Sequence, residues 1–133
     1  AVFELMWRFH FFYANLPDIL SRDPALQQDY QQVQQGVLMR VTAVLKALKQ
    51  SDIIDIDDED ITDLAHSIKL LVTFWISYLK TQAPDKDIDQ ASVYKGVLKV
   101  LLLFKPYATV QAKPRITRLQ QHYEALAGDV QLL

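Results

Sequence analysis

Three histidines are the residues of this chain most suited to hold a metal ion or move a proton. His10, His66 and His122 fall in different segments, and no two have the spacing of three or four residues that puts paired ligands on one helix face. The chain has no Cys, which excludes a cysteine-ligated metal, a disulfide and a thiol nucleophile. We therefore expect no metal site and no cofactor.

Two polar groups near the middle of the sequence suggest sites but do not meet their requirements. Asp63, His66 and Ser67 are neighbours on one predicted helix, and such neighbours cannot be arranged as acid, base and nucleophile. The acidic run at residues 55–60 has Asp60 where a calcium loop needs glycine and His66 where it needs glutamate. Helix capping explains these carboxylates better. We expect no catalytic residue and no enzymatic activity.

The composition indicates one domain that covers residues 1–133. Hydrophobic residues make up 50% of the chain and charged residues 23%, which suits a compact core that buries about two-thirds of the unfolded surface. The net charge of −2 gives no bulk attraction to nucleic acid or to an anionic membrane. Residues 70–79 are the longest nearly apolar stretch, well short of the about twenty residues that cross a bilayer. We expect a cytoplasmic domain without membrane contact.

Apolar residues recur at helical spacing, which predicts an all-α fold, a five-helix bundle. The expected helices cover residues 2–16, 24–48, 58–82, 88–104 (or as far as 107) and 114–128. Asp23 is placed to cap the second helix, and Pro24 suits its first position. Between the first two helices, residues 16–22 are predicted to form a turn with at most one turn of helix.

Two of these helices carry stripes that predict their buried faces. The stripe of the second helix is Leu26, Tyr30, Val33, Val37, Val41, Val44 and Leu48. Its solvent-exposed face near the start of the helix is expected to carry Gln27, Gln28, Gln31, Gln32, Gln34 and Gln35. The core stripe of the third helix is Ile61, Leu64, Ile68, Leu71, Trp75 and Leu79.

The third and fourth helices have more apolar circumference than one side of a helix can bury in a chain of this size. Because a soluble monomer seldom exposes a large apolar patch, we expect a homodimer that pairs two helices from each copy in a four-helix interface. The residues expected in this interface are Leu70, Thr73, Phe74, Ser77, Val97, Leu101 and Phe104. The alternative is that the first and last helices cover both sides within one monomer.

The first helix is unusually aromatic, and Trp7, His10 and Phe11 share one of its faces. Bulky flat side chains with a few polar groups are typical of the wall of a small-molecule cavity. The residues expected to bind a ligand are Trp7, His10, Phe11, Tyr13, Trp75, Tyr78 and Tyr94. An ordinary aromatic core is the alternative interpretation.

Two stretches have a characteristic order and spacing of residues. The first is Phe9-x-x-Phe12-Tyr13-x-x-Leu16-Pro17-x-Ile19-Leu20-x-Arg22-Asp23-Pro24, followed by Tyr30. The second is Leu64-Ala65-x-x-Ile68-x-Leu70-Leu71-x-x-Phe74-Trp75-x-x-Tyr78-Leu79. In this order and spacing the chain resembles the regulatory domain of TetR-type bacterial transcriptional repressors, although no single motif is diagnostic.

The resemblance implies a homodimeric regulator whose helical domain binds an unidentified hydrophobic small-molecule effector. The effector would change the DNA affinity of an N-terminal helix-turn-helix domain that this chain lacks, so DNA contact is expected only through that domain. Pocket residues vary too widely in the family to carry over by position. The alternative function is a stand-alone helical protein that binds a lipid or another hydrophobic ligand.

Overall fold

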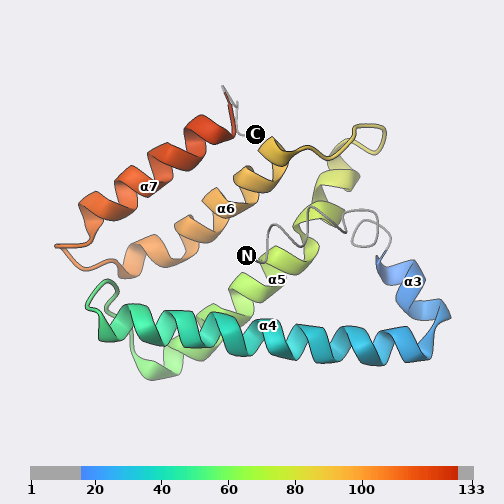
Figure 1. Cartoon of the computed structure of the whole chain (residues 1–133), viewed down its shortest axis with the longest axis horizontal. Helices are drawn as coiled ribbons and strands as arrows, with labels where there is room; N and C mark the ends of the chain where they lie inside the picture. Colours follow the sequence, from blue (N-terminus) through green and yellow to red (C-terminus); the bar gives the residue numbers. More distant parts are fainter. Residues whose placement is uncertain (1–15, 129–133) are drawn as a thin grey trace.

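The computed structural model describes residues 16–128, and all the regular elements within that range are helical (Figure 1). In order they are α3 (Leu16–Arg22), α4 (Pro24–Gln50), α5 (Asp58–Gln82), α6 (Gln90–Phe104), the short 3-10 helix η1 (Lys105–Tyr107) and α7 (Lys113–Leu126). The predicted all-α fold is confirmed. The helix expected at residues 2–16 lies outside the described range except for Leu16, and the seven-residue α3 forms where a turn with at most one turn of helix was expected.

Short polar residues set the starts of α4 and α6. The Asp23 carboxylate accepts a hydrogen bond from the Leu26 amide at 3.1 Å, with Pro24 in the first turn, as predicted. Asp89 caps α6 in the same way, accepting from the Ser92 amide at 2.9 Å and from the Ser92 hydroxyl at 2.7 Å. Because Asp89 takes the cap position in extended conformation, α6 begins at Gln90, two residues later than predicted.

The loop between α4 and α5, residues 51–57, is part of the core. Ile54 and Ile56 are buried although acidic residues surround them. Ile54 forms an isolated antiparallel bridge with Ala108, and the Asp55 amide donates to the Tyr107 carbonyl at 2.7 Å. The loop therefore ties the α4–α5 connection to the segment that joins α6 and α7.

The acidic start of α5 only partly matches the predicted capping role. Asp57 occupies the cap position, but its side chain makes no capping hydrogen bond. Asp58, Glu59 and Asp60 lie in the first turn, where carboxylates interact favourably with the helix dipole. Lys49 at the end of α4 contacts Asp58 at 2.9 Å, and this hydrogen bond and charge lower the Asp58 pKa.

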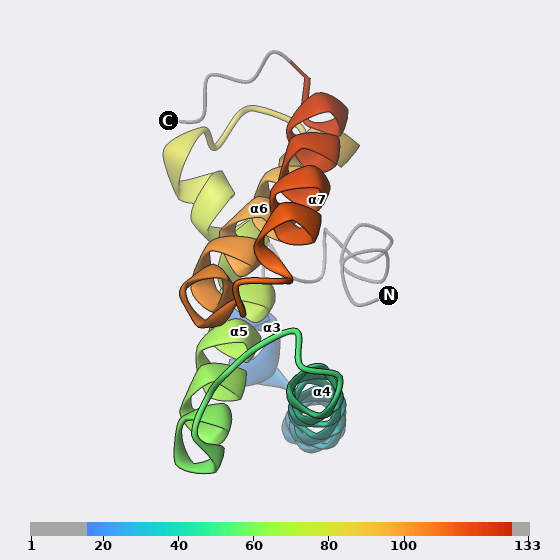
Figure 2. The same ribbon diagram turned by 90° about the vertical axis from the view of Figure 1, so that its left-hand side faces the viewer.

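The helix α5 is the centre of the described fold. It packs against α4 on one side and against α6 on the other, and α6 pairs with α7 (Figures 1 and 2). The predicted stripe of α5 is confirmed, with four members buried and Leu71 and Leu79 half-buried against the same cluster. The main cluster contains Leu45, Ile54, Ile56, Ile61, Leu64, Ala65, Ile68, Val72, Trp75, Ile76, Ile88 and Val93.

The predicted stripe of α4 was only partly right. Val41 and Leu48 pack against the main cluster as predicted, but Val33 and Val44, both assigned to the buried face, are exposed. The face that meets α5 carries Gln34, Leu38 and Leu45 together with Val41 and Leu48. The difference arises because a polar residue occupies the first position of the true stripe, so hydrophobicity alone selects the neighbouring register.

Candidate functional site

A groove lies between the first half of α4 and the middle of α5. The two helices are joined at one end by residues 51–57 and separate toward their other ends (Figure 1). Their separation leaves a hollow of about 580 Å³, and its lining residues are Tyr30, Gln31, Gln34, Gln35, His66, Lys69, Leu70, Thr73 and Phe74. We call this hollow the α4–α5 groove.

A buried polar pair lies at the groove. The Thr73 hydroxyl donates to Gln34 Oε1 at 3.0 Å, and the two residues are only 4% and 7% exposed. Within residues 16–128 the other end of this amide, Gln34 Nε2, makes no hydrogen bond. Burying an amide and a hydroxyl costs free energy that their mutual hydrogen bond offsets only in part. The pair therefore places a buried amide and a buried hydroxyl in the wall of the groove.

Among the lining residues that the structure describes, Lys69 is the only Asp, Glu, Lys or Arg. Its side chain is half-buried and makes no ion pair within residues 16–128. His66, about one turn earlier on α5, is exposed, and its Nδ1 donates to the Thr62 carbonyl at 2.9 Å. The described lining of the groove thus combines one positive charge with amide groups.

An apolar surface continues from the groove along α5. Leu70, Phe74 and Tyr78 follow one another at four-residue spacing and are 63%, 43% and 53% exposed. A second hollow of about 280 Å³ lies over these three residues together with Leu71 and Trp75, and it shares Leu70 and Phe74 with the groove. Polar and apolar recognition elements are therefore adjacent on one helix.

The predicted ligand-binding residues fall into three groups. Trp7, His10, Phe11 and Tyr13 lie outside the described residues. Trp75 and Tyr78 are brought together, with ring centroids 5.7 Å apart. Tyr94 is separate from them, because its ring contacts that of Tyr123 of α7 in a tilted arrangement, with the centroids 5.9 Å apart, in a second small cluster with Leu98, Leu101 and Ala127.

Trp75 has a structural part in this arrangement. Its ring is buried, and its Nε1 donates to the Ser92 carbonyl on α6 at 2.8 Å. The indole therefore locks α5 to α6 and needs no polar partner from a ligand. Of the predicted aromatic residues within residues 16–128, Tyr78 is the exposed one.

The predicted dimer residues are also divided. Leu70 and Phe74 are exposed, whereas Thr73 and Leu101 are enclosed within one copy of the chain. Ser77, Val97 and Phe104 are half-buried. The apolar surplus of α6 is thus largely used inside one copy, because α7 covers it. Leu102, Leu119 and Leu126 remain exposed on α6 and α7.

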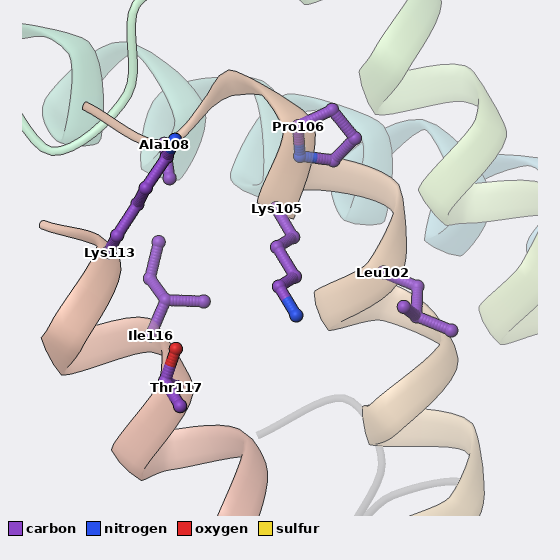
Figure 3. A pocket seen from close by; sticks show the side chains of 7 residues that line it. All are labelled: Leu102, Lys105, Pro106, Ala108, Lys113, Ile116 and Thr117. Atoms are coloured by element: carbon purple, nitrogen blue, oxygen red, sulfur yellow. The ribbon is translucent and has the colours of Figure 1, made fainter. Parts of the chain in front are cut away.

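A separate hollow of about 460 Å³ lies between α6 and α7 (Figure 3). Lys105 extends between the two helices there, opposite Ile116 and Thr117, and its Nζ donates to Gln120 Oε1 at 3.0 Å. Among its described lining residues, the only buried one is the apolar Ile116. This hollow is therefore chemically less specific than the α4–α5 groove.

Sequence reasoning missed Gln34, Lys69 and the apolar continuation as parts of one site. Gln34 was assigned to the solvent-exposed face of its helix, which the structure corrects. The available signal was its position four residues before Leu38 and seven before Val41, which places it on their face.

Within residues 16–128, no group of His, Asp and Glu side chains could hold a metal ion, and no helix is long and apolar enough to span a membrane.

Comparisons with known proteins identify the family. A family model described as TetR, bacterial transcriptional repressor, matches residues 1–116. The chain is similar to a TetR-family transcriptional regulator from Marinobacter aquaeolei VT8, with 28% sequence identity and a TM-score of 0.79 over 92% of this chain. It spans 58% of the length of that protein. No curated protein sequence matches the chain. The matched residues and the shared helical fold show that this chain belongs to the TetR family of bacterial transcriptional regulators.

Proposed function

We propose that this chain is the effector-binding and dimerisation region of a TetR-type regulator. A small molecule bound in the α4–α5 groove would change the DNA affinity of a helix-turn-helix domain outside the chain. Such a regulator acts on DNA in the cytoplasm and needs no catalytic residue. The observation that carries the effector role is the buried Gln34–Thr73 pair beside an open groove with an apolar continuation.

The position of the groove suggests how occupancy is communicated. The groove separates the half of α4 on which α3 packs from the half of α5 that is locked to α6 through Trp75. A ligand that favours a wider or narrower groove would therefore move α3 and the preceding chain relative to α6 and α7. It can shift the regulator only by the difference between its affinities for the two arrangements.

An effector role is testable with a neutral apolar dye and a variant that obstructs the groove. We expect Nile red to bind the full-length protein saturably. Leu70→Trp should weaken that binding, because Leu70 lines both the groove and the adjoining apolar hollow and the larger ring would obstruct them. Met39→Trp is the matched control, since Met39 is exposed on α4 and lines neither hollow.

The second step of this test concerns DNA. Duplexes enriched from a random library by the full-length protein provide its operator, and compounds that displace Nile red are then added. At least one displacing compound should change the Kd for the operator about fivefold or more. The effector role is wrong if every displacing compound leaves operator binding unchanged, or if both tryptophan variants bind Nile red as the wild type does.

For dimerisation we propose the outer surface of α6 and α7. Leu102, Leu119 and Leu126 are exposed there, whereas Leu70 and Phe74 of the originally expected interface line the groove. Covering α5 with a second copy would close the site, but pairing through α6 and α7 leaves it open. This arrangement keeps four helices in the interface.

Light scattering separates the two surfaces. We expect the protein to have twice the mass of one copy, and Leu119→Glu to reduce it to a single copy because an unpaired charge would be buried. Leu70→Glu should remain dimeric. The opposite pair of results would assign the interface to α5, and a monomeric wild type would contradict dimerisation altogether.

A further inference from the structure

The charge balance of the α4–α5 groove is one-sided. Lys69 is half-buried in its lining, and no carboxylate is among the lining residues that lie within residues 16–128. Lys69 also forms no ion pair within residues 16–128. The two ion pairs of these residues, Arg22–Asp18 and Lys49–Asp58, involve other cations. The ammonium group of Lys69 is therefore available to an anion brought by a ligand.

The buried amide of Gln34 adds a hydrogen-bond donor, which favours an anion as the Lys69 ammonium group does. Because the Thr73 hydroxyl already donates to Gln34 Oε1, the acceptor end of the amide is occupied and Nε2 is the end left to donate. Gln31 and Gln35 bring two more amide groups to the lining. Hydrogen bonds from such donors to an ionised acceptor are stronger than those to a neutral one.

The apolar surface formed by Leu70, Phe74 and Tyr78 has few polar groups that a ligand would have to pair. From Leu70 to Tyr78 the exposed stripe runs for about 12 Å along the helix axis. The indole N–H of Trp75 beneath it is already bonded to Ser92. An apolar tail can therefore lie along Leu70, Phe74 and Tyr78 without leaving a buried polar group unpaired.

We propose that the effector class is an amphipathic anion. Its carboxylate or comparable anionic head would contact Lys69 and Gln34 Nε2, and its hydrocarbon tail would lie on Leu70, Phe74 and Tyr78. This inference rests on the proposed effector role of the groove and adds the chemistry of the ligand. A cationic head would meet Lys69 with no compensating carboxylate, and a neutral head would gain only the weaker amide hydrogen bonds.

Three probes with the same decyl chain test the head group: decanoate, 1-decanol and decyltrimethylammonium. Calorimetric titration of the full-length protein, below the micelle range, should give the tightest binding for decanoate. Lys69→Met keeps the apolar stem of the side chain and should weaken decanoate about tenfold while changing 1-decanol less than about twofold. Lys69→Arg should retain the preference for the anion.

Lys95→Met is the matched control, because Lys95 is a half-buried lysine on α6 that lines neither hollow. It should leave all three affinities unchanged. Thr73→Val should also weaken decanoate, since it releases Gln34 Oε1 and frees the amide to turn its acceptor toward the head group. A loss with both Lys69→Met and Thr73→Val, and none with Lys95→Met, supports the proposed position.

Two results would overturn the ligand class. Equal binding of the three probes, with Lys69→Met behaving as the wild type, means that the groove recognises only the tail. Preference for decyltrimethylammonium means that the polar end attracts cations. Either result leaves the effector role standing if Nile red binding still depends on Leu70→Trp. Absence of binding by all three probes and by Nile red removes both proposals.

Discussion

The two ends of the α4–α5 pair show how one pair of helices serves as core and as site. Near the connecting loop, Leu45, Ile61 and Leu64 are buried, and Ile54 and Ile56 of the loop close the space between the helices. At the other end, Leu70 and Phe74 are exposed and the buried contact is the polar pair Gln34–Thr73. The chain is helical throughout both ends. Within residues 16–128, what differs is that a third element, the loop at residues 51–57, fills the gap at the first end.

The largest expected effect is the loss of a leucine side chain at the closed end. Leu64→Ala should lower the free energy of unfolding by about 3 kcal/mol, because it removes buried methyl groups and leaves a cavity in the main cluster. Urea denaturation measures this change. A loss below about 1 kcal/mol would mean that the closed end is loosely packed and that the two ends are alike.

The polar pair at the boundary between the two ends should contribute less. Thr73→Val keeps the shape of the side chain but leaves Gln34 Oε1 without its donor, so we expect a loss of about 1–2 kcal/mol. Gln34→Leu combined with Thr73→Val should recover most of that loss, since no unpaired group is then buried. If the single variant is as stable as wild type, water reaches the pair and the groove is deeper than described.

The start of α6 tests the link between the open end and the rest of the fold. Asp89 caps α6 through Ser92, and the carbonyl of the same Ser92 accepts from Trp75. Asp89→Ala should cost about 1 kcal/mol at neutral pH. Asp87→Ala in the preceding linker is exposed and serves as the control.

The same cap has a defined pH dependence. The side-chain and backbone hydrogen bonds from Ser92 lower the Asp89 pKa below its ordinary value of 3.8. A carboxylate with a lowered pKa in the folded state stabilises the protein above its ordinary pKa and loses that contribution as the pH falls through the lowered one. The stability difference between wild type and Asp89→Ala should therefore shrink only below about pH 4. A difference that is constant down to pH 2 would contradict capping by the ionised carboxylate.

Most of the helical framework is predictable because its signals are local. Asp23 with Pro24 marks the start of α4, and the apolar period of α5 identifies its buried face correctly. Each of these features depends on residues within a few turns of one another. The all-α class is predictable for the same reason, since strands need stretches in which apolar and polar residues alternate, and the sequence has almost none.

The candidate site is less predictable because it depends on residues far apart in the chain. Gln34 and Thr73 are separated by 39 positions, and neither looks unusual within its own helix. Ile54 and Ile56 are buried through contacts with residues near 108, which a local interpretation of an acidic loop does not contain. Leu101 was assigned to a dimer surface because the position of α7 across α6 was unknown.

The smallest expected effect is the most informative for the comparison. Leu70→Ala makes the same chemical change as Leu64→Ala on the same helix, but Leu70 is 63% exposed, so the loss should be below about 0.5 kcal/mol. Urea denaturation of the two variants under one set of conditions gives the difference directly. A loss of about 2 kcal/mol or more at Leu70 would show that chain outside residues 16–128, or a second copy, covers this surface. The groove would then be closed at rest, and an effector would have to displace that cover before it could bind.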